Sequence, residues 1–418
     1  MTRISKTVIS ASSELSRSKI LGFERNVLFT GLTSFLTDTS VKMIYSVMPL
    51  FLMSIGASKA SLGLIEGIAE STASLIKALS GFWSDRIGKN KPFMLAGYAL
   101  SAVILPFYAL VLSPMQVLIL RFAERFGKGI RTAPRDSLIA ASVTNNETGR
   151  GFGLQKAMDN SGAIAGPLIA FALLSLFPGN YRLLFLIAGI PAIAGVFVII
   201  FGIKEARKYK VELFTRFRFR DFSNRYWFFL GIIFVFTLGN STDALLLIKA
   251  NEAGIKVAFI PLVYLVTNVV SVAAAVPAGS LSDRIGKEKL LVAGFLIYAV
   301  VYFFFGLDIG KGMLIFLFAL YGLYSAATDG IQKAFVSDLV HSARRGTGLG
   351  IYNALVGITL LPASLIAGFL YDRVNSSIPF LFGAAMALLA AVMMIFYTVT
   401  GNSRGYQEHA ASKFGRGA

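Results

Sequence analysis

Long apolar segments separated by short polar connections follow one another along the chain. Each is close to the ~20 residues that an α-helix needs to cross the hydrocarbon core of a bilayer. The pattern therefore predicts an all-α membrane protein with twelve transmembrane helices. The predicted spans are 26–54, 59–83, 92–112, 115–140, 153–177, 182–203, 226–248, 257–281, 290–307, 312–339, 347–370 and 376–400.

The composition agrees with a membrane protein and excludes several other classes. Hydrophobic residues make up 55% of the 418 positions and charged residues only 15%, whereas soluble domains carry about 25% charged residues. The chain has no cysteine and two histidines, which excludes disulfides, thiolate metal ligands and histidine-rich metal sites. It also lacks G-x-S-x-G, H-E-x-x-H and phosphate-binding-loop motifs. We therefore expect neither an enzyme nor a protein that holds a metal or a cofactor.

The basic residues predict how the chain is oriented. The net charge is +18, from 40 Lys and Arg against 22 Asp and Glu. This excess would suggest a nucleic-acid partner in a soluble protein, but in a membrane protein it is typical of cytoplasmic loops. We expect a multi-pass protein of the cell (inner) membrane with both termini in the cytoplasm, no signal peptide and no nucleic-acid partner. On this orientation the opposite loops hold only Lys59, Arg182, Lys249, Lys256, Lys311 and Arg373.

Two sequence repeats predict that the chain consists of two related halves. The segment GFWSDRIGKNK (81–91) recurs as GSLSDRIGKEK (279–289), and a second segment, 150–167, is echoed at 345–362. Internal repeats of this length are typical of transporters built from two parallel halves. The predicted organisation is an N-terminal segment 1–25, a six-helix bundle 26–203, a basic linker 204–225, a second six-helix bundle 226–400 and a tail 401–418.

The repeated turn has the same residue types at the same spacing in both halves. They are Gly81, Asp85, Arg86, Gly88 and Lys89 in the first copy, and Gly279, Asp283, Arg284, Gly286 and Lys287 in the second. We expect the last glycine of each copy to let the chain turn at the end of a helix.

This turn resembles the signature of the major facilitator superfamily, G-x-x-x-D-R-x-G followed by two basic residues. Asn90 departs from it at the second basic position. The resemblance implies two pseudo-symmetric bundles that rock about a central cavity lined by helices 1, 4, 7 and 10. It also implies that the turns belong to the gates, with an ion pair from Asp85 at the cytoplasmic gate. The alternative is a turn that only anchors helix ends. We expect the protein to function as a monomer.

Ionisable residues inside the predicted spans are candidates for function, because each costs about 2.5–3.5 kcal/mol unless it is paired or hydrated. Four residues form one stripe on helix 115–140, three and four positions apart: Arg121, Glu124, Arg125 and Lys128. With ~1.5 Å rise per residue, Glu66 and Glu70 lie at the depths of Arg121 and Arg125. An arginine fork binds carboxylate or phosphate, so the stripe favours an anionic or zwitterionic substrate. The candidate substrate-binding residues are Arg121, Arg125, Lys128, Asn240, Asp243 and Asp329.

Carboxylates in the same region are candidates for carrying a proton. A nearby cation favours the ionised form of a buried carboxylate, whereas desolvation favours its neutral form, so opening and closing a cavity switches between the two. Arg121 and Glu124 also resemble the superfamily's R-x-x-Q-G motif, which is associated with proton coupling, although Arg125 stands at the glycine position. The sequence does not choose among the candidates, which are Asp38, Glu66, Glu70, Glu124 and Asp159. Asp159 is expected at the depth of Arg135.

Gly162, Gly166 and Pro167 resemble the G-x-x-x-G-P motif of the superfamily's exporters. The alternative is close packing, since small residues four positions apart let helix backbones approach. The many Phe and Tyr residues are expected to face lipid, and we assign none of them to a site.

The expected function is secondary transport, and three mechanisms remain open. The first is proton-coupled export of a small anionic, zwitterionic or amphiphilic organic molecule. The second is proton-coupled uptake of an organic acid, a sugar derivative or a siderophore. The third, from a different class, is a passive lipid-translocating protein or channel. The expected partners are a small-molecule substrate, protons and membrane lipids.

The gating role of the repeated turn is testable by Asp85→Asn. We expect slower turnover at normal expression, because the neutral side chain removes the ion pair that the resemblance assigns to the gate. The measurement is the initial transport rate per amount of inserted chain. Unchanged turnover with only the expression altered would assign the turn to membrane insertion instead.

Overall fold

The computed structural model describes residues 19–20, 22–143, 148–205, 222–240, 242–307, 309–340 and 345–414. For residues 19, 78, 81, 82, 85, 148–150, 345, 346 and 401–414 it describes the backbone alone. The side chain of Asp85, most of the predicted segments 1–25 and 204–225, and the side chains of the predicted tail 401–418 therefore lie outside the described part.

The described chain is almost entirely helical. An antiparallel pairing of two short strands, β1 (Lys19–Ile20) and β2 (Phe23–Glu24), precedes the first helix. The helices of the N-terminal half are α2 (Arg25–Tyr45), α3 (Met48–Ser54), α4 (Lys59–Ile87), α5 (Lys91–Phe107), α6 (Pro114–Ser142), α7 (Thr148–Leu176) and α8 (Tyr181–Gly202), with the short η1 (Tyr108–Leu110). Those of the C-terminal half are α9 (Asn224–Gly239), α10 (Ala244–Glu252), α11 (Ile260–Ile285), α12 (Lys287–Phe305), α13 (Lys311–Leu339), α14 (Arg345–Arg373) and α15 (Ile378–Phe414), with η3 (Val257–Phe259).

These helices confirm the predicted fold class of twelve spans in two six-helix bundles. The first span of each half is broken, into α2 and α3 in one half and into α9 and α10 in the other. At the second break the hydroxyl of Tyr298 donates to the carbonyl oxygen of Gly239 at 3.0 Å. This bond satisfies a backbone group that the interruption exposes.

Hydropathy separates the spans into two kinds. In the described part of the chain, nine helices are long and apolar enough to cross a membrane by themselves. The other three predicted spans are α2 with α3, α4, and α6. These are the helices that carry most of the ionisable residues of the N-terminal half, so their lower hydropathy marks helices that pack inside the protein.

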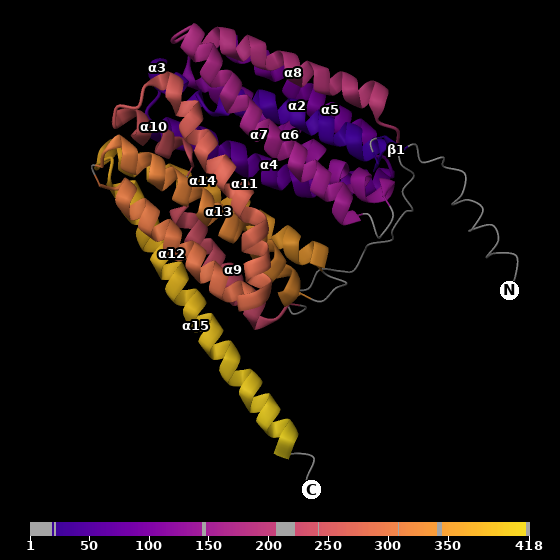
Figure 1. The fold of residues 1–418 in the computed structure, drawn as a ribbon, viewed down its shortest axis with the longest axis vertical. Coiled ribbons are helices and arrows are strands. Elements are labelled where there is room, and N and C mark those ends of the chain that lie inside the picture. The colour runs from indigo at the N-terminus through magenta and orange to yellow at the C-terminus, as the bar shows by residue number, and fades with distance from the viewer. Residues whose placement is uncertain are drawn as a thin grey trace, which may run out of the picture.

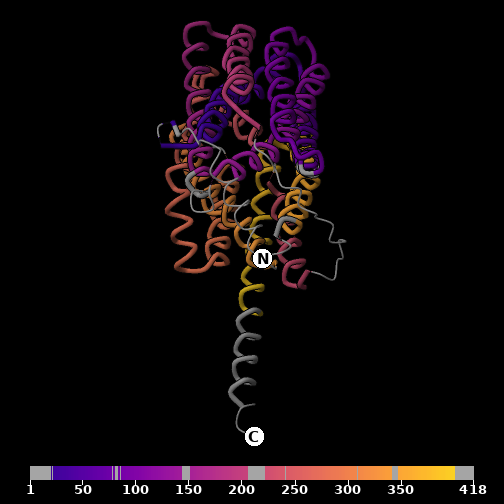
Figure 2. The backbone as a smooth tube through the Cα atoms, turned by 90° about the vertical axis from the view of Figure 1, so that its right-hand side faces the viewer, coloured from indigo at the N-terminus to yellow at the C-terminus, as the bar shows by residue number. Residues whose placement is uncertain are grey.

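The two halves meet at one end of the molecule, which we call the closed end. Figure 1 shows α3 of the N-terminal half and α10 of the C-terminal half near each other there, while the ribbons diverge toward the opposite end. The view turned by 90° in Figure 2 shows the same division into two halves. Helices α4 and α14 pack along each other across the boundary, as do α7 and α11.

Polar contacts join the halves at the closed end. The carboxylate of Asp372 in α14 accepts hydrogen bonds from the backbone N–H groups of Lys59 (3.2 Å) and Ala60 (2.7 Å). Asp372 thus caps the N-terminus of a helix in the other half, where the helix dipole favours a negative charge. The ammonium of Lys59 lies 3.7 Å from the carboxylate of Glu252 in α10. Further in, the hydroxyl of Ser71 donates to the carbonyl oxygen of Gly357.

The repeated turns lie at the end of the molecule opposite to the closed end. Gly88 ends α4 with φ +73° and Gly286 ends α11 with φ +96°. Both angles are in the left-handed region, which favours glycine. After the second turn, Lys287 pairs with Asp338, joining the start of α12 to the end of α13. Asp283 lies beside this pair in a shallow cavity of about 380 Å³.

The cap on α4 predicts how easily the closed end opens. Replacement of a capping residue by alanine costs about 1 kcal/mol, so Asp372→Ala should raise the open population of this end roughly five-fold. The chain has no cysteine, so a cysteine placed at Asn268 in the cavity reports access without background. The measurement is its labelling rate by a membrane-impermeant thiol reagent added from the closed side.

Arg373→Gln is the matched control, because it changes the neighbouring exposed charge on α14. An equal labelling rate in Asp372→Ala and the control would show that the cap does not hold the closed end shut.

Candidate functional site

A cavity of about 460 Å³ lies between the two halves and is lined by side chains from both. The N-terminal half contributes residues of α2 and α4. The C-terminal half contributes residues of the break between α9 and α10, and of α11, α13 and α14. The lining includes Lys42, Tyr45, Glu66, Glu70, Asn240, Thr242, Asp243, Tyr264, Thr267, Asn268, Ser271, Tyr321, Tyr324, Ser325, Asp329, Leu360 and Ser364.

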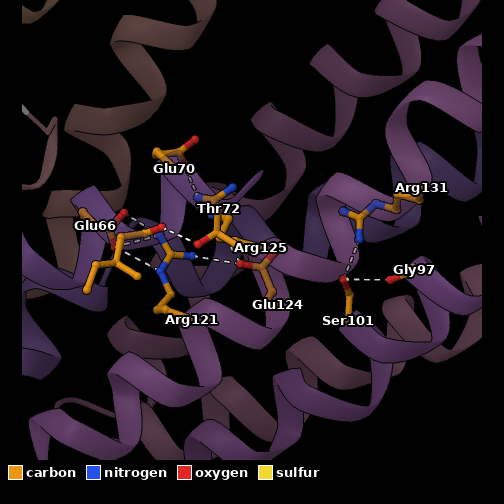
Figure 3. Close-up of polar contacts among 10 residues, drawn as sticks. Glu66, Glu70, Thr72, Gly97, Ser101, Arg121, Glu124, Arg125 and Arg131 are labelled. Carbon is orange, nitrogen blue, oxygen red and sulfur yellow. Dashed lines mark hydrogen bonds and ion pairs between the residues drawn. The ribbon is translucent and has the colours of Figure 1, made fainter. Parts of the chain in front are cut away.

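Behind this wall the guanidinium of Arg121 is enclosed by two carboxylates. Its Nη2 donates to both oxygens of Glu66 at 2.7 Å and its Nε to one of them at 3.0 Å. Its Nη1 lies 3.2 Å from Glu124. All three side chains are at most 3% exposed, and Figure 3 shows the two carboxylates on either side of the arginine. Such charge-assisted, two-point bonds are among the strongest polar contacts in proteins.

The pairing continues along α6 to a residue that water reaches. Arg125 lies 2.9 Å from Glu70 and 3.5 Å from Glu124. The five charges therefore alternate in sign in the order Glu66, Arg121, Glu124, Arg125, Glu70. Glu70 is 37% exposed and lines the cavity, whereas Glu124 is 1% exposed and its Oε1 has no hydrogen-bond partner among the described atoms.

Small residues bring α6 close enough for these pairs to form. At Gly127 an added Cβ would lie 2.8 Å from the carbonyl oxygen of Gly97 in α5. At Gly129 it would lie 3.0 Å from the carbonyl oxygen of Ala73 and 2.6 Å from Ile76, both in α4. Side chains larger than hydrogen would separate the helices here. The close approach places the arginines of α6 directly on the glutamates of α4.

Lys42 links the two halves across the cavity. Its ammonium donates to the hydroxyl of Tyr264 in α11 at 2.6 Å. It also lies 5.3 Å from the ring centre of Tyr45 and 5.1 Å from that of Tyr264. On its other side Tyr45 contacts the guanidinium of Arg121, 5.3 Å from the ring centre. These cation–π contacts connect the buried arginine to the cavity wall.

Hydroxyl groups satisfy the polar side chains of the C-terminal wall. Asp243 accepts from the hydroxyl of Tyr321 at 2.7 Å, and Asp329 accepts from Ser325 at 2.7 Å. The amide of Asn240 donates to the hydroxyl of Tyr324 at 3.0 Å. In the described part of the chain, neither aspartate has a cation within 4.0 Å.

A second polar cluster lies closer to the open end of the N-terminal half. Arg135 of α6 lies 3.6 Å from Asp159 of α7 and 3.1 Å from Asp136. Asp159 also accepts from Gln155 at 2.7 Å. The expectation that Arg135 and Asp159 lie at the same depth is confirmed. Asp38 lies next to Gly162 on the face of α2 that packs against α7.

Apart from Asp38 and Asp159, which lie where α7 contacts α2 and α6, the predicted substrate-binding and proton-coupling residues fall into two groups. Five of them line the cavity: Glu66, Glu70, Asn240, Asp243 and Asp329. The second group is Arg121, Glu124, Arg125 and Lys128, which are not among the described lining residues. In this structure the described lining of the cavity thus includes residues of α2 and α4 from the N-terminal half, and none of helix 4 (α6). The physical reason is that the glutamates of α4 lie between the cations of α6 and the cavity.

From the sequence we expected the Phe and Tyr residues to face lipid and assigned none of them to a site, and the structure corrects this. Four tyrosines line the cavity: Tyr45, Tyr264, Tyr321 and Tyr324. A signal was present on α13, where Tyr321, Ser325 and Asp329 follow at four-residue steps on one helix face. Lys42 carried no predicted role because its partner Tyr264 lies 222 positions away.

The motif of Gly162 and Gly166 packs α7 against α2. An added Cβ would lie 2.7 Å from the carbonyl oxygen of Phe35 at the first position, and 2.6 Å from that of Thr39 at the second. This geometry is the close packing that the sequence offered as the alternative to an exporter motif.

Known proteins resemble this chain in both sequence and fold. A family model described as Major Facilitator Superfamily matches residues 30–248 and again 227–415. An uncharacterised MFS-type transporter of Methanocaldococcus jannaschii is 34% identical over 378 residues, covering 89% of this chain and 94% of that protein. Multidrug resistance protein 1 of Bacillus subtilis is 32% identical over 176 residues, 41% of this chain and 42% of that protein.

Solved structures share the fold at low sequence identity. A crystal structure of a nucleoside transporter has a TM-score of 0.76 at 14% identity, covering 89% of this chain and 99% of that chain. A POT family transporter in complex with 5-aminolevulinic acid has a TM-score of 0.79 at 13% identity, covering 92% and 98%. Fold and cavity thus define a multi-pass membrane transporter. The chain belongs to the Major Facilitator Superfamily.

The enclosure of Arg121 predicts the effect of Arg121→Lys. A lysine cannot bond both oxygens of Glu66 and reach Glu124 as well. Loss of hydrogen bonds to charged groups should lower the free energy of unfolding by about 1.5–3 kcal/mol. We expect normal membrane insertion and nearly complete loss of transport. The measurements are thermal unfolding in detergent and initial transport rates in proteoliposomes.

Arg182→Lys, at an exposed position of the closed end, is the control for a conservative arginine change. Wild-type stability and transport in Arg121→Lys would mean that a single positive charge is enough at this position.

Proposed function

We propose that this transporter works by alternating access and exports a small organic molecule in exchange for protons. The observation that carries the proposal is the cavity between the halves, which is lined by ionisable groups and closed at one end by contacts that join the halves. A site with one closed end and two halves that pack across it fits a mechanism in which the halves rock about a bound substrate.

The positive-inside rule supports placing both termini in the cytoplasm. The closed end then faces the outside, and the structure corresponds to an inward-facing state. In this state the cavity takes up its substrate from the cytoplasm, as export requires.

Glu70 is the carboxylate best placed to exchange protons. It is the last residue in the series of five alternating charges, it lines the cavity, and its side chain is 37% exposed. When Glu70 takes up a proton, it no longer attracts Arg125, and Glu124 lies 3.5 Å away as a second partner for that arginine. Protonation would thus move a cation by a small distance inside the wall, without leaving it unpaired at low dielectric. Glu66, Glu124, Asp38 and Asp159 remain alternatives.

One feature supports export over uptake. Multidrug resistance proteins are among the relatives of this chain. Uptake of an organic acid, a sugar derivative or a siderophore is the alternative with the same cavity. A passive lipid-translocating protein or channel is the alternative without coupling.

The buried pairs also change the expected substrate. Arg121 and Arg125 already have carboxylate partners, so they do not favour a purely anionic molecule. Amphiphilic and zwitterionic molecules remain, and they suit a cavity lined by tyrosines as well as by charges.

Proton flux in proteoliposomes tests the function. Vesicles that hold the full chain and a pH gradient are exposed to panels of organic anions, zwitterions and lipophilic cations. We expect at least one panel to dissipate the gradient, and we expect Glu70→Gln to abolish this flux while substrate exchange without a gradient persists. The matched control is Glu288→Gln, which changes a carboxylate at the start of α12, in the C-terminal half.

The direction of the proton movement distinguishes antiport from symport. Substrate transport without any proton movement in the wild type would reject coupling and favour the passive class.

A further inference from the structure

We propose that the transported molecule is a zwitterion, with its anionic group toward the N-terminal half and its cationic group toward the C-terminal half. The proposal deepens the function proposed above and rests on it. It follows from how the two walls of one cavity divide their charges.

The C-terminal wall carries two carboxylates that have no cation within 4.0 Å in the described part of the chain. Asp243 and Asp329 both line the cavity, and the groups that bond them are the hydroxyls of Tyr321 and Ser325. The rings of Tyr321 and Tyr324 lie beside them, with centroids 5.3 Å apart. Carboxylates next to aromatic rings are the usual recognition site of an organic ammonium group.

The N-terminal wall has the opposite excess. Within the described cluster the cations outnumber the carboxylates by one when all are ionised: Lys42, Arg121, Arg125, Lys128 and Arg131 against Asp38, Glu66, Glu70 and Glu124. Arg121 and Arg125 are paired, whereas Lys42 bonds a neutral phenol and Lys128 has no carboxylate within 4.0 Å among the described side chains.

Lys42 is the cation through which this excess reaches a ligand. It lines the cavity, and its ammonium has three donors, of which the bond to Tyr264 uses one. Lys128 lies within electrostatic reach of Lys42 and Glu70 and adds to the positive potential of this wall.

A ligand with a single charge would satisfy one wall and leave the other unpaired. A buried charge without a partner is unfavourable because it has lost its water. A molecule with both charges satisfies the two walls together, and it spans the boundary that opens and closes during transport. This arrangement would make closure around the ligand depend on both of its charged groups.

Matched ligand sets test the proposal by direct binding to the full chain in nanodiscs. Three scaffolds are used: phenylalanine, the dipeptide alanyl-phenylalanine, and 3-(benzyldimethylammonio)propanoate. Each is compared with its methyl ester, which keeps only the cation. Each is also compared with an analogue that keeps only the anion. This is the N-acetyl form for the two amines, and for the quaternary ammonium it is the compound with carbon in place of nitrogen. We expect the zwitterion to bind at least ten-fold more tightly than both analogues on at least one scaffold.

Two variants locate the charged groups of the ligand. Asp243→Asn should weaken the binding of the zwitterion and of the ester at least five-fold and leave the binding of the anionic analogue unchanged. Lys42→Gln should weaken the binding of the zwitterion and of the anionic analogue, and Lys42→Arg should restore it. Lys256→Gln removes an exposed lysine outside the cavity and is the control. Thermal unfolding confirms that each variant is folded.

The proposal is wrong if no zwitterion binds more tightly than both of its analogues. Tighter binding of the esters would point to an organic cation, and tighter binding of the anionic analogues to an organic acid; either contradicts it. Equal weakening of all ligands in both variants would contradict the assigned orientation. Binding is measured without a pH gradient and does not depend on proton coupling. A preference for the zwitterion together with an absence of proton flux would therefore reject proton antiport and leave the zwitterion proposal standing.

Discussion

The guanidinium of Arg121, almost completely buried between Glu66 and Glu124, is the interaction on which the arrangement of the N-terminal half depends. A charge at this depth is stable only when its partners are in place, since removing one of them leaves the other charge without water or a counter-ion. The bonds therefore fix the rotation and the axial position of α4 against α6. Glu66 and Glu70 reach the cavity wall as a consequence.

Packing between small residues makes this polar core possible. In a bilayer the lipid tails are as apolar as leucine, so helices associate through close contact and polar bonds. The glycines that bring α6 onto α4 and α5 shorten the distance that the arginine side chains must span. The same principle joins α7 to α2 at Gly162 and Gly166, and α4 to α14 at the boundary between the halves.

The two halves share a backbone plan but differ in their chemistry. Each begins with a broken helix and repeats the same glycine-ended turn. One half satisfies its buried groups with ion pairs and the other with tyrosine and serine hydroxyls. The known family membership accounts for the shared plan. The difference in charge is a property of the individual side chains, and such differences allow one fold to carry many substrates.

The sequence by itself determined the spans, the twofold repeat, the turns at Gly88 and Gly286, and the matching depths of Arg121 with Glu66 and of Arg125 with Glu70. These follow from helix length and from depth, which the rise per residue sets. Only the tertiary structure decided that α6 lies behind the cavity and that four tyrosines line it. The hydrogen bond between Lys42 and Tyr264 could not be predicted from the sequence either. The rotation of a helix about its own axis, and contacts between residues 222 positions apart, depend on packing between helices, which no local pattern encodes.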